Sequence, residues 1–305
     1  MRPIAPAYQE KVNRIRICME YPSLKEAFVA LDDVNSKECY VSLTRDGFSL
    51  SCLTPLQVQG KKGKKASVEA SCRAQADYEF YSKDLFYYDY RLVTTEKKII
   101  PSFGFTVKTH DFLLRLKGLK TKKIGMLMEF DSCNICKEIA FSVPGSSSIT
   151  YLAITIPERN TSYVNQLETW FKGRDPSFRA SCTTFQGTIQ SAKQNKCDDI
   201  EFCINKRTKN FSARCWDKDT MVFSDPMVGD LDTLSYEQDE PDDSFISKHI
   251  NLTQNGWMDH IHKLCPESIV RIYIKEDPNA PLVLTTYIGH QGQAVHSIPD
   301  ASREA

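Results

Sequence analysis

Apolar residues in the stretch from Met19 to Thr54 follow first a helical spacing and then a strand spacing. The first group recurs three and four positions apart, which places it on one face of a short helix. The residues from Tyr40 to Thr44 and from Phe48 to Cys52 then alternate apolar with polar, as half-buried strands do. Between them, Arg45-Asp46-Gly47 predicts a hairpin turn in which the glycine supplies a positive φ. The apolar helix face consists of Leu24, Ala27, Phe28 and Leu31.

The same order of strand, helix, strand, turn and strand recurs three more times along the chain. The further units begin at Phe103, at Phe178 and near Ser247, and Thr109 is predicted to cap the helix of the second unit. Four units in one order constitute an internal repeat of supersecondary structure. Their apolar helix faces are Phe112, Leu113, Leu116 and Leu119 in the second unit, Phe185, Ile189 and Ala192 in the third, and Trp257, Ile261 and Leu264 in the fourth.

The repeat predicts how the chain divides into domains. Because each short helix covers only one face of its hairpins, the units must share sheets. Two units per domain and two domains is the economical arrangement, which gives an α+β fold class. We predict an N-terminal domain over residues 1–157, an interdomain connector over 158–176 and a C-terminal domain over 177–305. The connector is polar, and a surface helix accounts for its composition equally well.

Composition is that of an ordinary globular protein, with 41% hydrophobic and 26% charged residues among 305. The formal net charge is zero, so no global field attracts the chain to nucleic acid or to an anionic membrane. Any polyanion would have to be bound by a local basic surface. No apolar run approaches about 18 residues, and the first residues lack the apolar core of a signal peptide, so we expect neither a membrane span nor secretion.

The eleven cysteines predict reduced thiols in the core of an intracellular protein, because a long chain without a signal peptide is not a disulfide scaffold. Cys133-x-x-Cys136 is a single pair, whereas a zinc site needs four ligands. His260 and His262 lie on different faces of the predicted helix. With no phosphate-binding glycine loop, G-x-S-x-G or HExxH motif, we expect no metal and no cofactor. The cysteines in strand-like runs are Cys18, Cys39, Cys52, Cys182, Cys203 and Cys215.

This organisation resembles the DNA sliding clamps, the family of proliferating cell nuclear antigen and of the DNA-damage checkpoint clamp subunits. The segments that carry the resemblance are PSLKEAFVALDDV with CYVSLTRDGFSLSCLT, FTVKTHDFLLRLKGL, SFRASCTTFQGTIQSA with DIEFCINKRTKNFSARCWDKD, and Ser268 to Ile298. The resemblance implies subunits that join edge to edge, usually three to a ring, with short helices lining a hole for duplex DNA. It implies no catalysis; such rings are placed on DNA by a clamp loader and tether polymerases, nucleases, ligases or checkpoint proteins in the nucleus.

The resemblance also assigns three sets of residues to sites. Cations on the polar helix faces would contact DNA, apolar residues near the first hairpin and the last strand would receive a short hydrophobic peptide, and two strands would pair between neighbouring subunits. The DNA-contacting set is Lys25, Arg115, Lys117, Lys120, Lys122, Lys123, Lys193, Lys196 and Lys263. The peptide-pocket set is Leu53, Val58, Pro281, His296, Ile298 and Pro299. The interface set is Tyr151 and Ile154 of one subunit with Phe211 and Ala213 of the next.

Within the family, the neutral charge and the insertions at Gly60 to Lys65 and Glu237 to Asp243 favour a checkpoint-type subunit. A divergent replicative processivity factor, which would be a homotrimer, is the alternative. The basic insertion is either a nuclear-localisation or phosphate-binding patch or a disordered loop. Two readings from other classes are an α+β enzyme of unrecognised type, with the aromatic segment Tyr78 to Tyr90 lining a pocket, and an interaction scaffold that never meets DNA.

Overall fold

The computed structural model describes residues 13–33, 38–53, 75–131, 133–154, 176–205, 211–215, 220–225, 245–252, 256–275 and 280–298. Five of the features predicted above lie outside these ranges, and the side chain of Leu53 is also not described. None of the helices in the described ranges is long and apolar enough to cross a membrane. The predicted features outside the ranges are Val58, Pro299, the basic insertion 60–65, the acidic insertion 237–243 and most of the connector 158–176.

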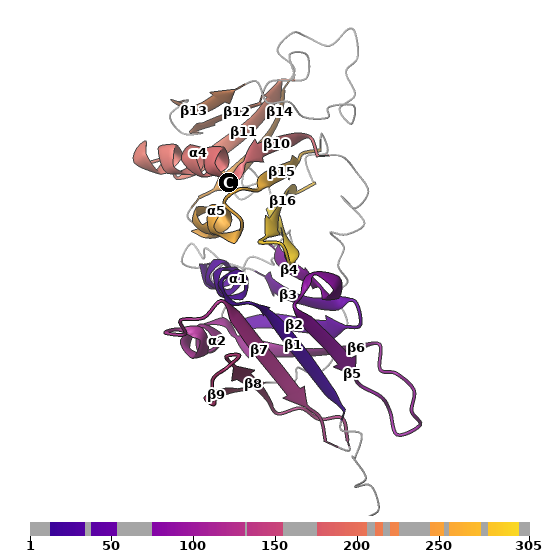
Figure 1. Cartoon of the computed structure of the whole chain (residues 1–305). Helices are drawn as coiled ribbons and strands as arrows, with labels where there is room; N and C mark the ends of the chain where they lie inside the picture. The colour runs from indigo at the N-terminus through magenta and orange to yellow at the C-terminus, as the bar shows by residue number, and fades with distance from the viewer. Residues whose placement is uncertain are drawn as a thin grey trace, which may run out of the picture.

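The elements follow the predicted order of strands and short helices (Figure 1). Those of the first half are β1 (Arg14–Glu20), α1 (Tyr21–Asp33), β2 (Glu38–Thr44), β3 (Gly47–Leu53), β4 (Gln75–Tyr81), η1 (Ser82–Asp84), β5 (Tyr87–Arg91), β6 (Ser102–Lys108), α2 (Thr109–Leu116), β7 (Lys123–Glu129), β8 (Glu138–Ser142) and β9 (Ile149–Ala153). Those of the second half are β10 (Phe178–Ser181), α4 (Cys182–Gln194), β11 (Asp199–Asn205), β12 (Phe211–Cys215), β13 (Thr220–Asp225), β14 (Phe245–Asn251), η2 (Gly256–His260), α5 (Ile261–Leu264), β15 (Ile269–Tyr273), β16 (Leu282–Ile288) and β17 (Gly292–Ile298).

Three antiparallel sheets carry the fold. A five-stranded sheet has the order β5-β1-β7-β8-β9 and belongs to the first half. A four-stranded sheet has the order β13-β12-β11-β14 and belongs to the second half. The eight-stranded sheet, β10-β15-β16-β17-β4-β3-β2-β6, contains strands of both halves and joins them where β17 pairs with β4.

The strand orders show the internal repeat directly. Within the eight-stranded sheet, β4-β3-β2-β6 of the first half repeats as β13-β12-β11-β14 in the second. In the same way β1-β7-β8-β9 of the first half repeats as β10-β15-β16-β17. The predicted α+β fold of repeated strand-helix-hairpin units is therefore confirmed by the pairing of the strands.

The helices form a layer along one side of the sheets, at the left of Figure 1. α1 packs against α2, η2 and α5, and α4 packs against η2 and α5, so the helices of both halves form one row. The predicted apolar faces of α1 and α4 are buried, and Phe28 stacks on Phe112 with ring centroids 3.7 Å apart. These helices are held by packing against sheets and neighbours, because helices of this length have little stability alone.

The fourth predicted helix is shorter than its apolar spacing implies. Residues 256–260 form a 3₁₀-helix and Ile261–Leu264 add a single α-helical turn. The turn ends before Cys265 because the next residue, Pro266, disfavours helical conformation in the residue that precedes it. Trp257, Ile261 and Leu264 are nevertheless buried, as predicted.

Two predictions about individual residues are wrong. Thr109 does not cap α2 but is its first residue. Its side chain is fully buried, and its hydroxyl donates a hydrogen bond to Oδ1 of Asp32 in α1 at 3.0 Å. Cys215, predicted to be a free thiol, forms a disulfide with Cys197, across a Cα–Cα distance of 5.3 Å. This pairing depends on how the turn between α4 and β11, which carries Cys197, meets β12 in space, and residue spacing does not encode that. The other cysteines predicted to be reduced, Cys18, Cys39, Cys52, Cys182 and Cys203, are free.

Candidate functional site

The row of helices has a solvent-facing surface on which positively charged side chains are unevenly distributed. Five cations lie between Asp111 and Glu129, with no acidic residue among them. They come from the end of α2, the loop that follows it and the start of β7, and Gly118 with φ +90° turns the chain in that loop. The structure thus brings together five predicted DNA contacts, all of them exposed: Arg115, Lys117, Lys120, Lys122 and Lys123.

Three of the four other cations of the predicted set have neighbours that reduce their effect, and the fourth, Lys196, is exposed just after α4. Lys193 of α4 forms an ion pair with Asp259 of η2. Lys25 of α1 is half-buried, and its Nζ lies 4.0 Å from the carboxylate of Glu26. Lys263 Nζ lies 3.3 Å from Nδ1 of His260. The positive surface of the described helices is therefore concentrated at α2 and weak along α4.

Lys123 differs from the cations next to it. Its Nζ lies 4.0 Å from the ring centroid of Phe86, a side chain that is 49% exposed. A cation above an aromatic face is attracted by the ring quadrupole. Lys123 is therefore held toward the five-stranded sheet, whereas Arg115, Lys117, Lys120 and Lys122 have no ion-pair partner among the described residues.

Each of the three sheets has two edge strands among the strands that the structure describes, and β9 and β13 are the edges that correspond to the predicted interface. β9 ends the five-stranded sheet and pairs only with β8, and β13 ends the four-stranded sheet and pairs only with β12. On β9, Ile149 and Tyr151 are 51% and 50% exposed. The predicted Ile154, just beyond β9, is half-buried against the core. Open edges with exposed apolar side chains are the surfaces on which sheets of separate chains pair.

The interface prediction needs a correction on its second strand. Phe211 and Ala213 lie in β12, which pairs with β11 on one side and β13 on the other. Both residues are buried, at 3% and 0% exposure. A strand that is paired on both sides cannot take a third partner, and the open edge next to β12 in this sheet is β13.

The peptide-pocket prediction also needs a correction, because two of its residues face the core. His296 and Ile298 are 1% exposed and point to the helix side of β17. There His296 stacks on Trp257 of η2, with centroids 3.6 Å apart, and its burial lowers its pKa to about 3. Pro281, just before β16, is half-buried.

Residues of the opposite parity make a small apolar cluster on the other face of the same sheet. Tyr273, Val283 and Val295 form this outer-face cluster, which is separate from the main core. Val295 pairs across the sheet with Thr285 and lies one position from His296. Sequence reasoning missed the cluster because β17 is buried on both faces and shows no apolar–polar alternation.

A polar cluster that the sequence did not indicate lies on the four-stranded sheet. Glu201 of β11 stands between Arg214 of β12 and His249 of β14, and its carboxylate accepts hydrogen bonds from both sides. Burial opposes the charge of Glu201, but these hydrogen bonds and one from Ser247 hold its pKa below the usual value. Among the described residues no group of His, Cys, Asp and Glu could hold a metal ion.

No family model matches the sequence, and no curated protein matches it. Solved structures do match the fold. A structure of A. fulgidus PCNA, solved with the C-terminal region of FEN-1 bound, superposes with a TM-score of 0.61 at 11% identity, over 94% of this chain and 98% of that one. PCNA from Thermococcus kodakaraensis gives 0.60 at 12% identity, over 94% and 99%. PCNA from Entamoeba histolytica gives 0.61 at 9% identity, over 94% and 98%.

The matches extend along nearly the whole of this chain and of each compared chain. They include both halves of the repeat, so they confirm the resemblance that the strand and helix pattern indicated. Identities near one residue in ten establish architecture and leave the role of each side chain to be tested. This chain therefore has the fold of the PCNA sliding clamps.

Proposed function

We propose that this chain is a subunit of a ring that encircles duplex DNA and tethers other proteins to it. The observation that carries the proposal is the join between β17 and β4. β17 is the repeat counterpart of β9, and β4 is the counterpart of β13. The pairing that joins the two halves within the chain is therefore available between chains, because β9 and β13 have open sides among the described strands.

If β9 of one subunit pairs with β13 of the next, whether a copy or a sister subunit, the subunits assemble head to tail. A heterologous contact of this kind closes into a ring when the rotation per subunit is right. Closure would cover the apolar side chains of Ile149 and Tyr151 on β9, which are half exposed in the single chain. Three subunits of two halves each would close a six-fold arrangement, with the helix row facing inward.

The helix row supports contact with duplex DNA. Unpaired lysines and arginines that touch phosphates give sequence-independent, salt-sensitive binding, which permits sliding. The cations that fit this role are Arg115, Lys117, Lys120 and Lys122, because they are exposed and have no ion-pair partner among the described residues. A topological link needs little intrinsic affinity, so this modest cluster is sufficient for a ring that holds DNA by enclosure.

The outer-face cluster of Tyr273, Val283 and Val295 supports a tethering role. It lies on the sheet face opposite the helix row, where a bound partner would not obstruct DNA. One of the similar structures holds the C-terminal region of FEN-1 on a PCNA. We propose that this chain binds short apolar peptide motifs of polymerases, nucleases or checkpoint proteins at that face.

A checkpoint-type subunit is the proposed subclass, and a homotrimeric replicative factor is the alternative. The zero net charge and the insertions at 60–65 and 237–243 favour the first. The two subclasses differ in assembly, since a checkpoint-type subunit needs two sister subunits. Light scattering on the purified chain separates them: a mass near three times 34.8 kDa indicates the homotrimer, and a monomer indicates the heteromer. Both roles place the chain in the nucleus.

The test of enclosure uses the complete assembly, purified through a tag on this chain. It is mixed with clamp loader, ATP and nicked circular plasmid and passed over a sizing column. We expect the assembly to co-elute with the circle and to be lost once a restriction enzyme makes the plasmid linear. Retention that is equal on circular and linear DNA, or absent on both, would contradict the proposal.

Charge reversal tests which surface meets DNA. The triple change Arg115→Glu, Lys117→Glu and Lys120→Glu should reduce loading on the circle at least tenfold, because each lost phosphate contact also removes counterion release. The matched control reverses Lys83, Lys98 and Lys137, which are exposed on other elements, and should load normally. Equal loss in both triples would mean that net charge, and not the helix row, determines binding.

A further inference from the structure

Two arginines face each other across adjacent strands on the outer face of the eight-stranded sheet. Arg179 of β10 is in register with Arg271 of β15, so the two side chains leave the sheet on the same face. Directly opposed side chains have Cβ atoms about 4.5–5.5 Å apart, and like charges in that position repel. Neither guanidinium has a carboxylate partner among the residues the structure describes.

A tyrosine holds one of these arginines in place. Arg271 Nη2 donates a hydrogen bond to the hydroxyl of Tyr287 at 2.9 Å, and the guanidinium carbon lies 4.7 Å from the ring centroid. Because that hydroxyl accepts from Arg271, its own hydrogen can be donated to a ligand. Tyr287 is 46% exposed, so this donor reaches solvent.

No acidic residue in register compensates the pair. The carboxylate that shares the cross-strand row with Arg271 is Asp77, which lies three strands away, about 14 Å. Asp77 is buried, and one of its oxygens accepts a hydrogen bond from Gln75. The chain therefore keeps two opposed positive charges together without a described counter-charge, which is unfavourable unless an anion is bound there.

An apolar side chain borders the charged pair. Ile269 precedes Arg271 by two positions on the same strand face and is 43% exposed. An extended peptide with an acidic or phosphorylated residue beside an apolar one would contact both the arginine pair and Ile269. Two planar guanidiniums fit a phosphate or carboxylate through paired N–H donors.

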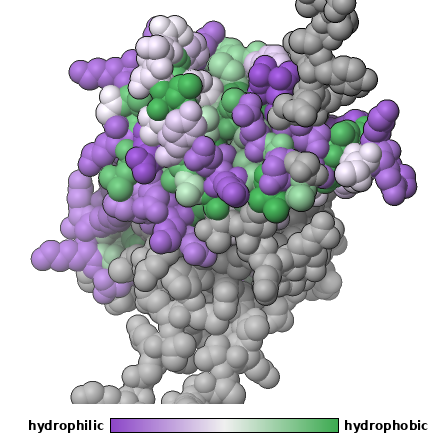
Figure 2. All heavy atoms as spheres, turned by 90° about the horizontal axis from the view of Figure 1, so that it is seen from below, coloured by the Kyte–Doolittle hydropathy of each residue, from purple (hydrophilic) through white to green (hydrophobic). Residues whose placement is uncertain are grey.

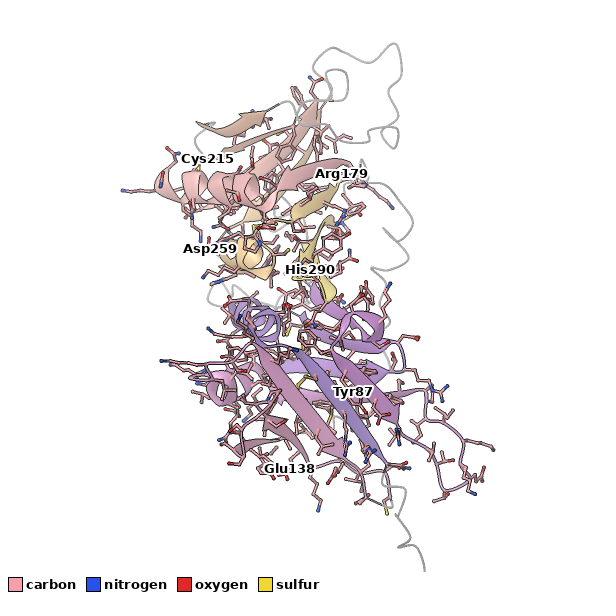
Figure 3. All side chains as sticks on the ribbon, viewed as in Figure 1. Tyr87, Glu138, Arg179, Cys215, Asp259 and His290 are labelled. Atoms are coloured by element: carbon pink, nitrogen blue, oxygen red, sulfur yellow. A yellow bond between two sulfur atoms is a disulfide. The ribbon has the colours of Figure 1, made fainter. Side chains whose placement is uncertain are left out.

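The position of the pair favours a protein segment over DNA. α4 packs on the side of β10 and β15 that buries Phe178 and Ala180, so Arg179 points away from the helix row, as Figure 3 shows. Duplex DNA requires a long track of cations, whereas this face offers two arginines followed by neutral residues. One or two acidic side chains are the ligand that a site of this size can neutralise.

We propose that Arg179, Arg271 and Tyr287 bind an acidic segment of a partner protein, with a phosphoserine or a carboxylate between the two guanidiniums. This site lies away from the helix row and next to the outer-face cluster on the same sheet face, and it does not depend on ring closure. Both ligands share the same chemistry, an anionic side chain on an extended peptide, and binding assays with the two forms distinguish them.

The test measures fluorescence anisotropy of three labelled peptides with the full-length chain. The peptides share one sequence, with an isoleucine beside two variable positions that lie two residues apart. Those two positions are both phosphoserine in the first peptide, both aspartate in the second and both serine in the third. We expect at least tenfold tighter binding of an anionic peptide than of its serine form. If the three peptides bind equally, or none binds, the proposal is overturned.

Variants assign the binding to the pair. Arg179→Ala and Arg271→Ala should each weaken binding of the anionic peptide about tenfold or more. Arg271→Lys should bind it better than Arg271→Ala but less tightly than the unchanged chain, because lysine lacks the paired donors. Arg179→Glu should abolish binding while the chain still folds, since it replaces a repulsion with an attraction across the strands. Arg91→Ala is the matched control, an exposed arginine already paired with Asp89, and should bind as the unchanged chain does.

Two competitors distinguish the other possible occupants. A 24-base-pair duplex should not displace the anionic peptide from the unchanged chain at equimolar concentration; displacement would assign the site to nucleic acid and overturn the proposal. Replacing residues 237–243 by a glycine–serine segment of equal length removes the acidic stretch of the chain itself. If the peptide binds only after this replacement, the occupant is internal and the partner assignment is wrong.

Discussion

His296 and Trp257 stack face to face at the junction of the two halves, with ring centroids 3.6 Å apart and planes 5° from parallel. Tyr78 of the first half meets the same imidazole edge-on at 5.3 Å. Neither ring nitrogen of His296 has a hydrogen-bond partner in the part of the chain that is described. An imidazole in such a place is kept neutral, because a charge there would lose its hydration without compensation.

Acid should therefore destabilise the protein through His296. Burial lowers the pKa of His296 from 6.5 to about 3, so stability is intact above pH 6.5. Below that value the unfolded chain binds the proton first, and stability falls by about 1.4 kcal/mol per pH unit until pH 3. Urea unfolding of the unchanged chain should lose about 2 kcal/mol more between pH 6.5 and 5.0 than that of His296→Phe, which keeps the stack.

Other groups titrate in the same range, so the comparison of the two proteins is the measurement. His290→Phe is the control, because it replaces a histidine that is exposed at the turn before β17 (Figure 3). Identical slopes for the unchanged chain and His296→Phe would show that His296 is accessible to protons in the folded state.

Gln291, in the turn between β16 and β17, is predicted to stabilise the contact between the two halves. Its Oε1 accepts from the backbone N–H of Glu20 at 2.7 Å, and its Nε2 donates to the carbonyl of Asp84 at 3.3 Å. Gln291→Ala would leave both groups without these partners and should cost about 1–3 kcal/mol in chemical unfolding. Gln293→Ala, two positions along, removes only a 3.4 Å contact with Tyr81 and should cost less than about 0.5 kcal/mol.

The disulfide between Cys197 and Cys215 is predicted to stabilise the half that contains the edge strand β13. It closes a loop over a sequence separation of 18 residues, and such a cross-link stabilises by about 3 kcal/mol when it restricts the unfolded chain. Cys197→Ser with Cys215→Ser should lower the free energy of unfolding by about that amount. Cys133→Ser, an exposed free thiol, is the control. Thiol counting by mass spectrometry under denaturing conditions checks that the bond is present before the comparison; a full count of free thiols would contradict this prediction.

The edge β9 is predicted to be the site of assembly. Tyr151→Asp places a charge among the apolar side chains of that edge and should shift the complete assembly to separate subunits in light scattering, by more than tenfold in dissociation constant. Tyr87→Asp makes the same change at the opposite edge of the same sheet, where β5 ends it, and Tyr87 is 47% exposed. If the assembly survives Tyr151→Asp but not Tyr87→Asp, the contact lies on β5 and the prediction for β9 is wrong.

The described residues at the end of the first half form a mixed surface in the view of Figure 2. Figure 2 shows the end of the first half with hydrophilic residues dominant and hydrophobic ones scattered among them. A large contiguous apolar patch would be expected if this end were itself a permanent interface. The strand edge, and not the end face, is therefore the feature to change.

The local elements could be predicted from sequence because their cause is local. Leu24, Ala27, Phe28 and Leu31 follow the helical period, and all four are buried in α1. Contacts between distant segments could not be predicted in this way. The pairing of β17 with β4 joins residues more than 200 positions apart, and the Cys197–Cys215 bond depends on how the turn after α4 meets β12 in space.

The errors at the candidate site have physical origins. Strand β17 is buried on both faces, so its residues show no apolar–polar alternation. Strand β12 does alternate, but alternation does not reveal that a strand is paired on both sides. His296 and Val295 are neighbours in sequence but lie on opposite faces of β17. A resemblance at one identical residue in ten therefore missed the face of β17 and placed the interface one strand away from the open edge β13.

The continuous sheet has a mechanical consequence for any assembly of these chains. Six cross-strand pairs connect β17 to β4, and the Gln291 contacts brace the same junction. Rotating one half against the other would have to break these pairs together, so each chain behaves as a stiff arc. Strain in a closed ring would then be released at the joints between chains, and those joints are where it would part to let a DNA strand enter.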